Sequence, residues 1–411
     1  MENPRSNGKS RIKNVSTKSV NLTGLLPLAL LPFLLSVAQV AAKDDAFTPA
    51  NPPEMKPIAS HHTPAYRAAK EFLRGVNLGD YLEAPPQYFG RGVRVSAADI
   101  AQIKHEGFDH VRVPIGWQHY ADPAPDYTLS PEIFGRVDFI VTNALADGVA
   151  VMINIHHFDE LDSDPAAATG EFLAIWKQIA AHYEHFSEKL AFELDNEPHD
   201  NATTALMNPV YAQTIAEIRQ TNPERTIFVE PGGWGVIGEL KHLVLPPDKN
   251  VIVSVHCYEP FYFTHQGATW TRGLTPVTGI VFPGPPAQPL VPDPKLDLKP
   301  AMLDWIHKYN TLPAAQNPSS PRAFTAKLKY IRAWSDYYGR PVHLGEFGAY
   351  TKADEQSRAN FYSTFRQAAE QENIGWCIWD WIAGFRYWDN QNNRPMPGMH
   401  EALFGKSNSN P

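Results

Sequence analysis

Two short stretches of the sequence end a mostly apolar run with a glutamate. In Leu190–Pro198, apolar residues recur at every second position before Asn196, Glu197 and a proline follow. In Val342–Gly348, Glu346 stands near the end of a similar run. A period of two predicts a strand, and such apolar runs are typical of strands buried in a parallel sheet. Two strand-end carboxyl groups are what the enzymatic hydrolysis of a glycoside uses, one as an acid and one as a base or nucleophile.

For either stretch alone, a structural role competes with this chemical one. Asn196 and Glu197 could cap the following helix or pair with a basic residue at the surface. The second glutamate, Glu346, favours the chemical interpretation, because two separate predicted strands then end in a carboxyl group.

The composition is that of an ordinary globular protein and excludes some classes of partner. The 411 residues are 43% hydrophobic, which is ample material for a large core. The net charge of -8 argues against nucleic acid or an anionic membrane as partner. The 10 Trp, 16 Tyr and 21 Phe supply aromatic faces on which sugar rings can stack. With only Cys257 and Cys377, neither a disulfide framework nor a cysteine-rich metal site is available.

The N-terminal segment has the pattern of an export signal. Basic residues between Arg5 and Lys18 precede the apolar run Leu25–Val40, and small residues follow up to Ala42. We expect residues 1–42 to be a signal peptide cleaved after Ala42, so that the protein is secreted or periplasmic; an uncleaved anchor is the alternative. The run is short for a membrane span and contains prolines, so we expect no stable span. Residues 43–66 then predict a flexible leader, 67–405 the folded domain and 406–411 a disordered tail.

Predicted strands and helices alternate through the folded domain. The strands are Phe72–Leu78, His110–Ile115, Val149–Ile155, Leu190–Leu194, Thr226–Glu230, Val251–Tyr258, Val342–Gly348 and Gly375–Trp381. The helices are Ser96–Glu106, Pro131–Asp147, Pro165–Phe186, Ala205–Gln220, Ser320–Tyr338 and Ala353–Gln371. This order predicts an α/β fold, a (β/α)8 TIM barrel in one domain. The Pro-rich segment Glu259–Pro318 after the sixth strand is too long for a plain loop, and loops of that length are usually functional.

Polar residues gather at the predicted strand ends, where barrels of this kind carry their active sites. They are Asn77, Arg112, His156, Asn196, Glu197, His256, Tyr258, Glu346 and Trp379. Arg112 could instead form an internal salt bridge with Glu193. His156 and His157 could be a structural pair or metal ligands, but no third ligand stands at a diagnostic spacing, so we expect no metal and no other cofactor.

These segments, in this order, resemble glycoside hydrolase family 5, the cellulase family. The resemblance rests on Phe192–Pro198 and Leu344–Gly348, which match the acid/base and nucleophile strands, and on Val111–Pro114, Asn154–His157, His256–Tyr258 and Ile378–Trp379. It extends over residues 70 to 390. The loop Glu259–Ala268, followed by Trp270, is similar to bacterial endoglucanases of the family, some of which also accept mannans. The run Phe282–Pro300 departs from the family pattern.

The resemblance implies a retaining mechanism with Glu197 as acid/base and Glu346 as nucleophile. Arg112 would keep Glu346 ionised, and Tyr258 would donate a hydrogen bond to it. Asn196 would contact the sugar 2-hydroxyl, and Trp379 would form the floor under the reacting sugar. The other residues implied to bind substrate or orient the carboxyl groups are Asn77, Glu83, His156, His157, His256, His265 and Trp270.

The expected function is a retaining endo-β-1,4-glucanase that acts on a β-glucan polysaccharide as a monomer. A β-mannanase or a mixed glucan/mannan enzyme is the main alternative, because the motifs do not encode the hydroxyl geometry of the sugar. A catalytically silent carbohydrate-binding barrel, or an exo-acting or β-1,3-specific relative, remains open. We also expect Cys257 and Cys377 to stay free thiols, because the sixth and eighth strands are not neighbours in the barrel.

Overall fold

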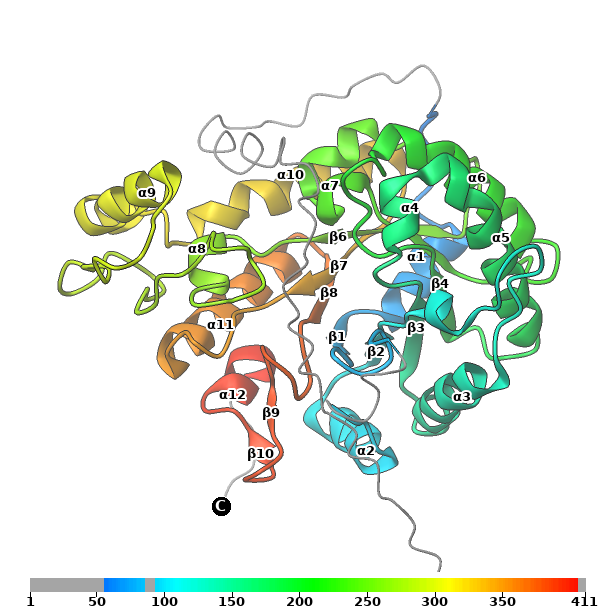
Figure 1. Ribbon diagram of the computed structural model, residues 1–411, viewed down its shortest axis with the longest axis horizontal. Helices are drawn as coiled ribbons and strands as arrows, with labels where there is room; N and C mark the ends of the chain where they lie inside the picture. The colour runs from blue at the N-terminus through cyan, green and yellow to red at the C-terminus, as the bar shows by residue number, and fades with distance from the viewer. Residues whose placement is uncertain (1–54, 86–92, 406–411) are drawn as a thin grey trace, which may run out of the picture. The chain divides into compact units, whose positions relative to one another are not determined.

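The computed structural model describes residues 55–85 and 93–405. Eight parallel strands, each paired with the next in chain order and β8 with β1, close into a barrel (Figure 1). The strands are β1 (Arg74–Asn77), β2 (His110–Val113), β3 (Ala150–Asn154), β4 (Leu190–Glu193), β5 (Ile227–Val229), β6 (Val251–His256), β7 (Val342–Phe347) and β8 (Gly375–Ile378). Every one lies within its predicted range, so the predicted (β/α)8 barrel is confirmed.

Helices follow the strands around the outside of the barrel. The six predicted helices are present as α2 (Ala97–Glu106), α3 (Pro131–Ala146), α5 (Pro165–His182), α6 (Thr204–Ile218), α10 (Arg322–Tyr338) and α11 (Glu355–Gln371). In α2, Ser96 and Asp99 form a capping box, and Gly107 closes the helix with a φ of 108°. Both signals are legible in the sequence, which is why the bounds of this helix match the prediction.

Several short elements were not predicted. Between β5 and β6 the chain forms only α7 (Gly232–Gly235) and the 3-10 helix η4 (Ile237–His242). The others are α4 (Asp159–Ser163), α8 (Phe261–Thr264), α9 (Pro300–Thr311), α12 (Met399–Phe404), β9 (Trp388–Asp389), β10 (Arg394–Pro395) and the 3-10 turns η3 (Trp117–Tyr120) and η5 (Ala314–Gln316). For α9 a signal was available. Pro300 occupies the favourable first position, and Met302, Ile306 and Tyr309 form one buried face.

The domain begins earlier than the predicted boundary at residue 67. The predicted signal, residues 43–54 of the leader and the tail lie outside the described residues, but residues 55–66 pack against the barrel. Met55 is buried, and the N–H of Ile58 donates to the carbonyl of Tyr338 at 2.9 Å. The helix α1 (Pro64–Ala68), capped by Thr63, is followed by the 3-10 turn η1 (Ala69–Glu71). The Pro- and Ala-rich composition suggested a linker, yet alanine is also the strongest helix former.

The base of the barrel interior holds mainly apolar side chains together with two buried histidines, His110 and His343, and the layer above it is polar. Ala65 of α1 packs with Phe72, Met152, Phe228 and Ile252 in a small cluster separate from the main core. This cluster fills the end of the barrel where the strands begin. The main core lies between the strands and the surrounding helices. A packed base leaves the carboxyl ends of the strands as the place where polar groups can meet a ligand.

The long segment after β6 divides into two parts. Its first part, with α8, stays close to the barrel mouth. The Pro-rich run Phe282–Pro300 is instead anchored outside, where the N–H of Phe282 donates to Ser357 of α11 at 3.0 Å and the amide of Asn360 donates to the carbonyl of Phe282 at 3.1 Å. The run that departs from the family pattern therefore packs on the outer helices.

Two further expectations can be compared with the structure. Cys257 and Cys377 are both buried free thiols, as predicted, and β7 separates the strands that carry them. Among the described residues, no helix combines the length and the apolar character that crossing a bilayer demands.

One buried histidine at the base makes stability depend on pH. His343 is 3% exposed, and neither of its ring nitrogens has a hydrogen-bond partner; His110 lies against it at 5.1 Å between ring centroids. Burial lowers the pKa of His343 well below its usual range, and His110 and Arg112 lower it further. The folded chain therefore binds fewer protons here than the unfolded chain. This contribution to stability is present above the unfolded pKa of about 6.5 and is lost as the pH falls below it.

We predict that His343→Leu makes the protein less sensitive to acid. At pH 5 the unfolded state of the wild type gains roughly 2 kcal/mol from protonating this side chain, and the variant lacks that term. The measurement is the free energy of unfolding in urea between pH 7.5 and 5. His105→Gln, on the exposed face of α2, controls for the loss of one surface histidine. Parallel pH curves for wild type and His343→Leu would contradict the prediction.

Candidate active site

The two predicted glutamates meet at the mouth of the barrel. Glu346 belongs to β7, and Glu197 lies four residues beyond β4. One carboxylate oxygen of each and one ring nitrogen of His256 lie within 4.8 Å of one another. The side chain of Glu346 is 6% exposed and that of Glu197 is 19% exposed. The strand-end carboxyl groups that the sequence predicted are therefore close enough to act on one bond.

A register shift lets Glu346 reach the interior. Val255 of β6 pairs with Leu344, but the next residue, His256, pairs with Glu346, so Gly345 is an extra residue on β7. A Cβ atom on Gly345 would lie 2.5 Å from the hydroxyl of Ser254 and 2.9 Å from Nε2 of His256. Only glycine allows this close approach. The bulge turns Glu346 inward, where strict alternation from Leu344 would direct it toward the helices.

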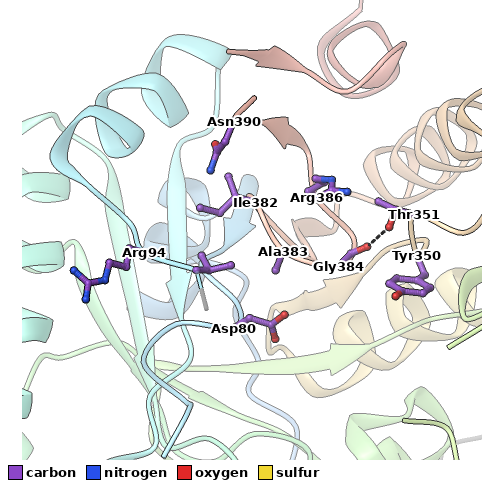
Figure 2. Close-up of a pocket in the computed structure, with 10 residues that line it drawn as sticks. Asp80, Arg94, Tyr350, Thr351, Ile382, Ala383, Gly384, Arg386 and Asn390 are labelled. Carbon is purple, nitrogen blue, oxygen red and sulfur yellow. Dashed lines mark hydrogen bonds between the residues drawn. The ribbon is translucent and has the colours of Figure 1, made fainter. Parts of the chain in front are cut away.

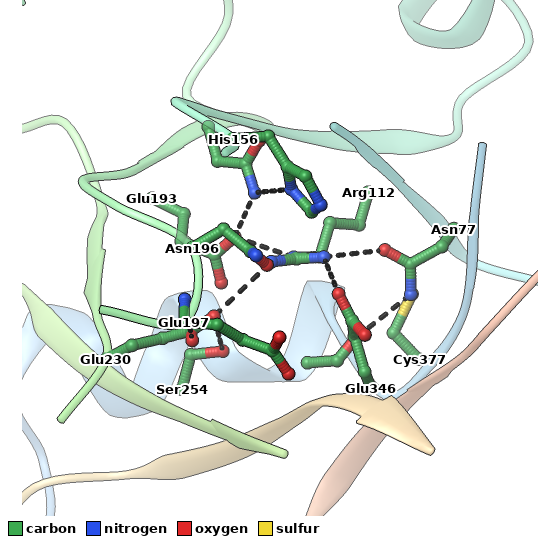
Figure 3. Close-up of polar contacts among 12 residues, drawn as sticks. Asn77, Arg112, His156, Glu193, Asn196, Glu197, Glu230, Ser254, Glu346 and Cys377 are labelled. Carbon is green, nitrogen blue, oxygen red and sulfur yellow. Dashed lines mark hydrogen bonds and ion pairs between the residues drawn. The ribbon is translucent and has the colours of Figure 1, made fainter. Parts of the chain in front are cut away.

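Arg112 of β2 occupies the centre of the polar layer (Figure 3). Its Nε donates to Glu193 at 2.6 Å, and its Nη1 donates to Glu346 at 2.7 Å. Nη1 also donates to Asn77, and Nη2 to Asn196. Both expectations for this arginine are thus met at once, because it forms the internal salt bridge and also contacts the predicted nucleophile.

Glu346 is held as an acceptor on both oxygens. Oε1 accepts from Arg112, and Oε2 accepts from the hydroxyl of Tyr258 at 2.6 Å. Burial raises the pKa of Glu346 above that of an exposed glutamate, and the Glu197 carboxyl adds to the rise; His256, Arg112 and Tyr258 act in the opposite direction by stabilising the carboxylate. The hydrogen bonds from Arg112 and Tyr258 stabilise the carboxylate of Glu346, which is the form that can attack carbon.

Glu197 is held by a second, separate set of partners. Its Oε1 contacts Nδ1 of His256 at 2.7 Å, and its backbone N–H donates to Oε2 of Glu230 at 2.9 Å. Nε2 of His256 lies 2.9 Å from Oε1 of the same Glu230. Burial alone would lower the pKa of His256, but the charges of Glu230 and Glu346, together with Glu197, which lies within hydrogen-bond distance of Nδ1, raise it well above its usual range. These neighbouring carboxyl groups favour the charged form of His256.

The same residues include the donor atoms of a possible metal site. Glu197, His256 and Glu346 could supply three ligand atoms at one point. Both ring nitrogens of His256 already face carboxyl oxygens, at 2.7 Å from Glu197 and 2.9 Å from Glu230, and both oxygens of Glu346 accept hydrogen bonds from Arg112 and Tyr258. The donor set fits a proton-bearing cluster better than a metal centre.

The remaining predicted residues at the strand ends line the same mouth. Asn77, at the end of β1, accepts a hydrogen bond from Arg112 through Oδ1 and donates one to the carbonyl of Gly345 through Nδ2. Asn196 is buried, and its Oδ1 accepts from Arg112 at 2.6 Å. The ring of His156 stacks on Trp379 at 5.9 Å between centroids with 11° between planes. His157 follows with a φ of 55° and is exposed.

A pocket of about 550 Å³ is lined by the loops that follow β1, β7 and β8, through residues such as Asp80, Tyr350 and Arg386 (Figure 2). Gly79, just before Asp80, packs so tightly on the indole of Trp379 that a Cβ there would lie 2.6 Å from the ring. The pocket therefore continues the barrel mouth on the β8 side.

The three predicted rim residues have different environments. Trp270 is 52% exposed, and its ring meets Tyr350 edge-on at 4.8 Å, so it borders the pocket. His265 is 8% exposed, and burial lowers its pKa to about 3, so it is a neutral ring packed between Tyr258 and Phe261. Glu83 is buried: its carboxylate accepts the N–H groups of Asp80 and Tyr81, and burial raises its pKa to about 8.

Two buried carboxyl groups of the layer had no predicted role at the site. Glu230 joins the backbone of Glu197 to His256. Glu193 was expected only as a possible partner of Arg112; it also accepts from Asn154 at 2.9 Å, and burial raises its pKa to about 7 against the effect of Arg112. The available signal was the position of both at the end of an apolar strand, since a carboxyl group rarely stands there without a partner.

A barrel that brings two strand-end glutamates this close together has the arrangement of a glycoside hydrolase. The chain belongs to the cellulase family, glycosyl hydrolase family 5, whose model matches residues 70–384. The family resemblance seen in the sequence is thereby confirmed.

Relatives of known name support this membership. Endoglucanase H of Acetivibrio thermocellus is 27% identical over 331 residues, which are 80% of this chain and 31% of the relative. Endoglucanase 3 of Fibrobacter succinogenes is 26% identical over 355 residues, 82% of this chain and 53% of the relative. The chain thus spans about a third to a half of these relatives. Among solved structures, Thermotoga maritima Cel5A in complex with cellobiose is 34% identical with a TM-score of 0.71, and the match covers 83% of this chain and all of that one.

We predict that Arg112→Lys destabilises the fold by about 3–5 kcal/mol, because one ammonium group cannot reach the carboxylates on separate strands that the guanidinium joins. Urea unfolding followed by tryptophan fluorescence measures the change. Arg136→Lys is the control, since Arg136 pairs with Glu132 along the surface of α3 and such pairs contribute about 0–1 kcal/mol. Similar small losses for both variants would contradict the prediction.

Proposed function

We propose that this protein is a retaining endo-β-1,4-glucanase, with Glu197 as acid/base and Glu346 as nucleophile. The observation that carries the proposal is the spacing of the two carboxyl groups, whose nearest oxygens lie within 4.8 Å. Retaining enzymes hold their carboxyl groups about 5–5.5 Å apart, whereas inverting enzymes leave about 6.5–9.5 Å for a water molecule. The titles of the similar proteins, endoglucanases from several bacteria, support the substrate class.

In the first step, Glu346 attacks the anomeric carbon while Glu197 gives its proton to the departing glycosidic oxygen. Arg112 and Tyr258 hold the attacking carboxylate in place and keep it from rotating. Asn196, fixed by Arg112, is placed to bind the 2-hydroxyl, a contact that strengthens in the transition state. The result is a glycosyl ester on Glu346 and a Glu197 carboxylate.

In the second step, water replaces the ester bond. Glu197 now acts as base and takes a proton from the water that attacks the anomeric carbon. The exposed fraction of its side chain, 19%, lets water approach from its side of the sugar. Glu346 leaves as a carboxylate, to which Arg112 and Tyr258 again donate.

Mannan is the second candidate substrate. One solved structure of the Thermotoga maritima enzyme, 34% identical to this chain, is titled as a complex with mannotriose. A product profile on soluble β-1,4-glucan, mixed-linkage glucan, glucomannan and mannan tests the proposal. We expect rapid loss of viscosity on β-1,4-glucan. Activity on mannan alone, or release of single end sugars without loss of viscosity, would contradict it.

We further propose that the chain is exported and acts as a monomer. The basic lead and apolar run of residues 1–42 support export. Action as a monomer is consistent with a site in which Glu197 and Glu346 are held entirely by side chains of their own barrel.

Removing either carboxylate separates the two roles. We predict that Glu197→Gln and Glu346→Gln each lower kcat on β-1,4-glucan by roughly 10²–10⁴-fold or more without unfolding the protein. On an aryl cellobioside with a good leaving group, Glu197→Gln keeps near-normal kcat/KM, because little acid assistance is needed. Glu346→Gln loses activity on both substrates. Near-normal reaction of the aryl substrate by Glu346→Gln would reverse the assignment.

Trp270 offers a platform for a sugar remote from the cleaved bond. Half of its surface is exposed, which favours a binding surface over an anchor in the core. We predict that Trp270→Ala lowers kcat/KM on a long glucan by about 10- to 100-fold, since an aromatic platform contributes on the order of 1–3 kcal/mol. On a short aryl glycoside the change is small.

Leu303→Ala is the matched control for this variant, because Leu303 lies in the same long segment, on α9, and is also 52% exposed. Equal losses of Trp270→Ala on long and short substrates, with a lowered Tm, would show that Trp270 anchors the loop instead.

A further inference from the structure

Glu230 links two parts of the same catalytic residue. It directly follows β5 and is completely buried. Its Oε2 accepts the backbone N–H of Glu197, and its Oε1 lies 2.9 Å from Nε2 of His256. His256 in turn contacts the side-chain Oε1 of Glu197 through Nδ1. One buried carboxylate therefore holds the main chain of Glu197 directly and its side chain through an imidazole.

The hydrogen bond from the N–H of Glu197 to Glu230 holds Glu197 in an unfavourable backbone conformation. Glu197 has a φ of 51°, in the left-handed region that residues with a side chain rarely adopt. The accepting oxygen is sealed from solvent by the loop after β5, where Gly235 has a φ of 63° and a Cβ atom would lie 2.8 Å from Oε2 of Glu230. Glu230 thus holds the backbone of Glu197 in place without any contribution from substrate.

In the contact between His256 and the side chain of Glu197, the surrounding charges determine which atom donates and which accepts. Burial would raise the pKa of Glu230, but His256, Arg112 and the N–H of Glu197 outweigh it and lower the pKa below the usual range. Nε2 of His256 lies 2.9 Å from the ionised Glu230, and Nδ1 lies 3.7 Å from Glu346 as well as 2.7 Å from Glu197. Negative charge beside both nitrogens favours a proton on each, and in that state Nδ1 can only donate. Oε1 of Glu197 must then accept, which leaves Oε2 as the oxygen that bears the carboxylic proton.

Resting on the function proposed above, we propose that Glu230 is a positioning residue that selects the proton-bearing oxygen of the acid/base Glu197. It does so by holding the N–H of Glu197 and, through His256, by making Oε1 the acceptor. The proton on Oε2 then passes to the glycosidic oxygen as the bond to the anomeric carbon breaks, and Glu197 keeps the electron pair as a carboxylate.

A simpler role for Glu230 is that of a counter-ion to Arg112. The distances argue against this as its main role. Glu230 lies 3.3 Å from Nη2 of Arg112, whereas Glu193 and Glu346 lie 2.6 and 2.7 Å from other nitrogens of the same guanidinium. Its contacts to Glu197 and His256 are shorter, at 2.9 Å each.

The two roles predict different kinetics for Glu230→Gln. If Glu230 positions the acid, kcat/KM falls about 10- to 100-fold on cello-oligosaccharides, whose leaving group needs the proton. On an aryl cellobioside with a good leaving group it changes less than about 3-fold. Glu193→Gln is the matched control, because Glu193 is equally buried and also pairs with Arg112, but among the described residues no hydrogen bond or ion pair joins it to Glu197 or His256. We expect this variant to affect both substrates to the same extent. Equal losses on both substrates for Glu230→Gln would overturn the proposal.

A spectroscopic measurement tests the same link without any substrate. In ¹⁵N-histidine NMR spectra near neutral pH, the wild type should show His256 protonated on both ring nitrogens, and Glu230→Gln should lose one of these protons. A retained imidazolium in Glu230→Gln would overturn the proposal. If the wild type cleaves neither substrate, the proposed function fails while the NMR result still decides the role of Glu230.

Should Glu230→Gln not fold, Glu230→Asp is the second variant, because it keeps the charge but withdraws the carboxylate. Its loss of kcat/KM should again be greater on cello-oligosaccharides than on the aryl cellobioside, by a smaller ratio. Equal losses on both substrates would also overturn the proposal.

Discussion

The buried guanidinium of Arg112 is the interaction on which the barrel mouth depends. Three carboxyl groups, from Glu193, Glu230 and Glu346, share a space from which water is excluded, and burying them without a cation would cost several kcal/mol each. A guanidinium presents its N–H groups in a plane and can meet partners on several strands at once. The contacts of Arg112 extend to β1, β4 and β7 and to the ends of β4 and β5, so the register of these strands and the charge balance of the site are set together.

The close packing of side chains inside the barrel also explains why β6 and β7 depart from regular pairing beside Glu346. A side chain at position 345 would collide with Ser254 and His256. Gly345 is the extra residue of β7, and the bulge that it forms rotates Glu346 into the barrel. Glu197 solves a similar problem differently, through a left-handed backbone held by Glu230. In both cases local strain or irregularity stands where a carboxyl group must face the substrate, and the surrounding hydrogen bonds maintain it.

The sequence predicts the barrel well because buried strands and capped helices are encoded locally. It also identifies Glu197 and Glu346, since both end apolar strands. It does not predict how Glu346 turns inward, because strict alternation from Leu344 would place it outside, and the bulge depends on contacts with β6. The role of Glu230 is invisible for the same reason: its partners Glu197 and His256 lie 33 and 26 residues away, and only the closed barrel brings them together. The burial of Glu83 is also not visible in the sequence, because its carboxylate is covered only when the loop folds back on it.

The two glutamates receive different cations, and this difference suits their proposed tasks. Glu346 is bound by Arg112, whose charge is permanent, and lies 3.7 Å from the ring of His256. Glu197 has no contact with Arg112 among the described residues; its cation is His256 at 2.7 Å, a group that Glu230 already neutralises. The nucleophile must be ionised when it attacks and again when it leaves, so a fixed charge is appropriate. An acid/base must change its charge twice in each cycle. It therefore requires a neighbour whose field is largely balanced, together with the greater exposure to water that the side chain of Glu197 has.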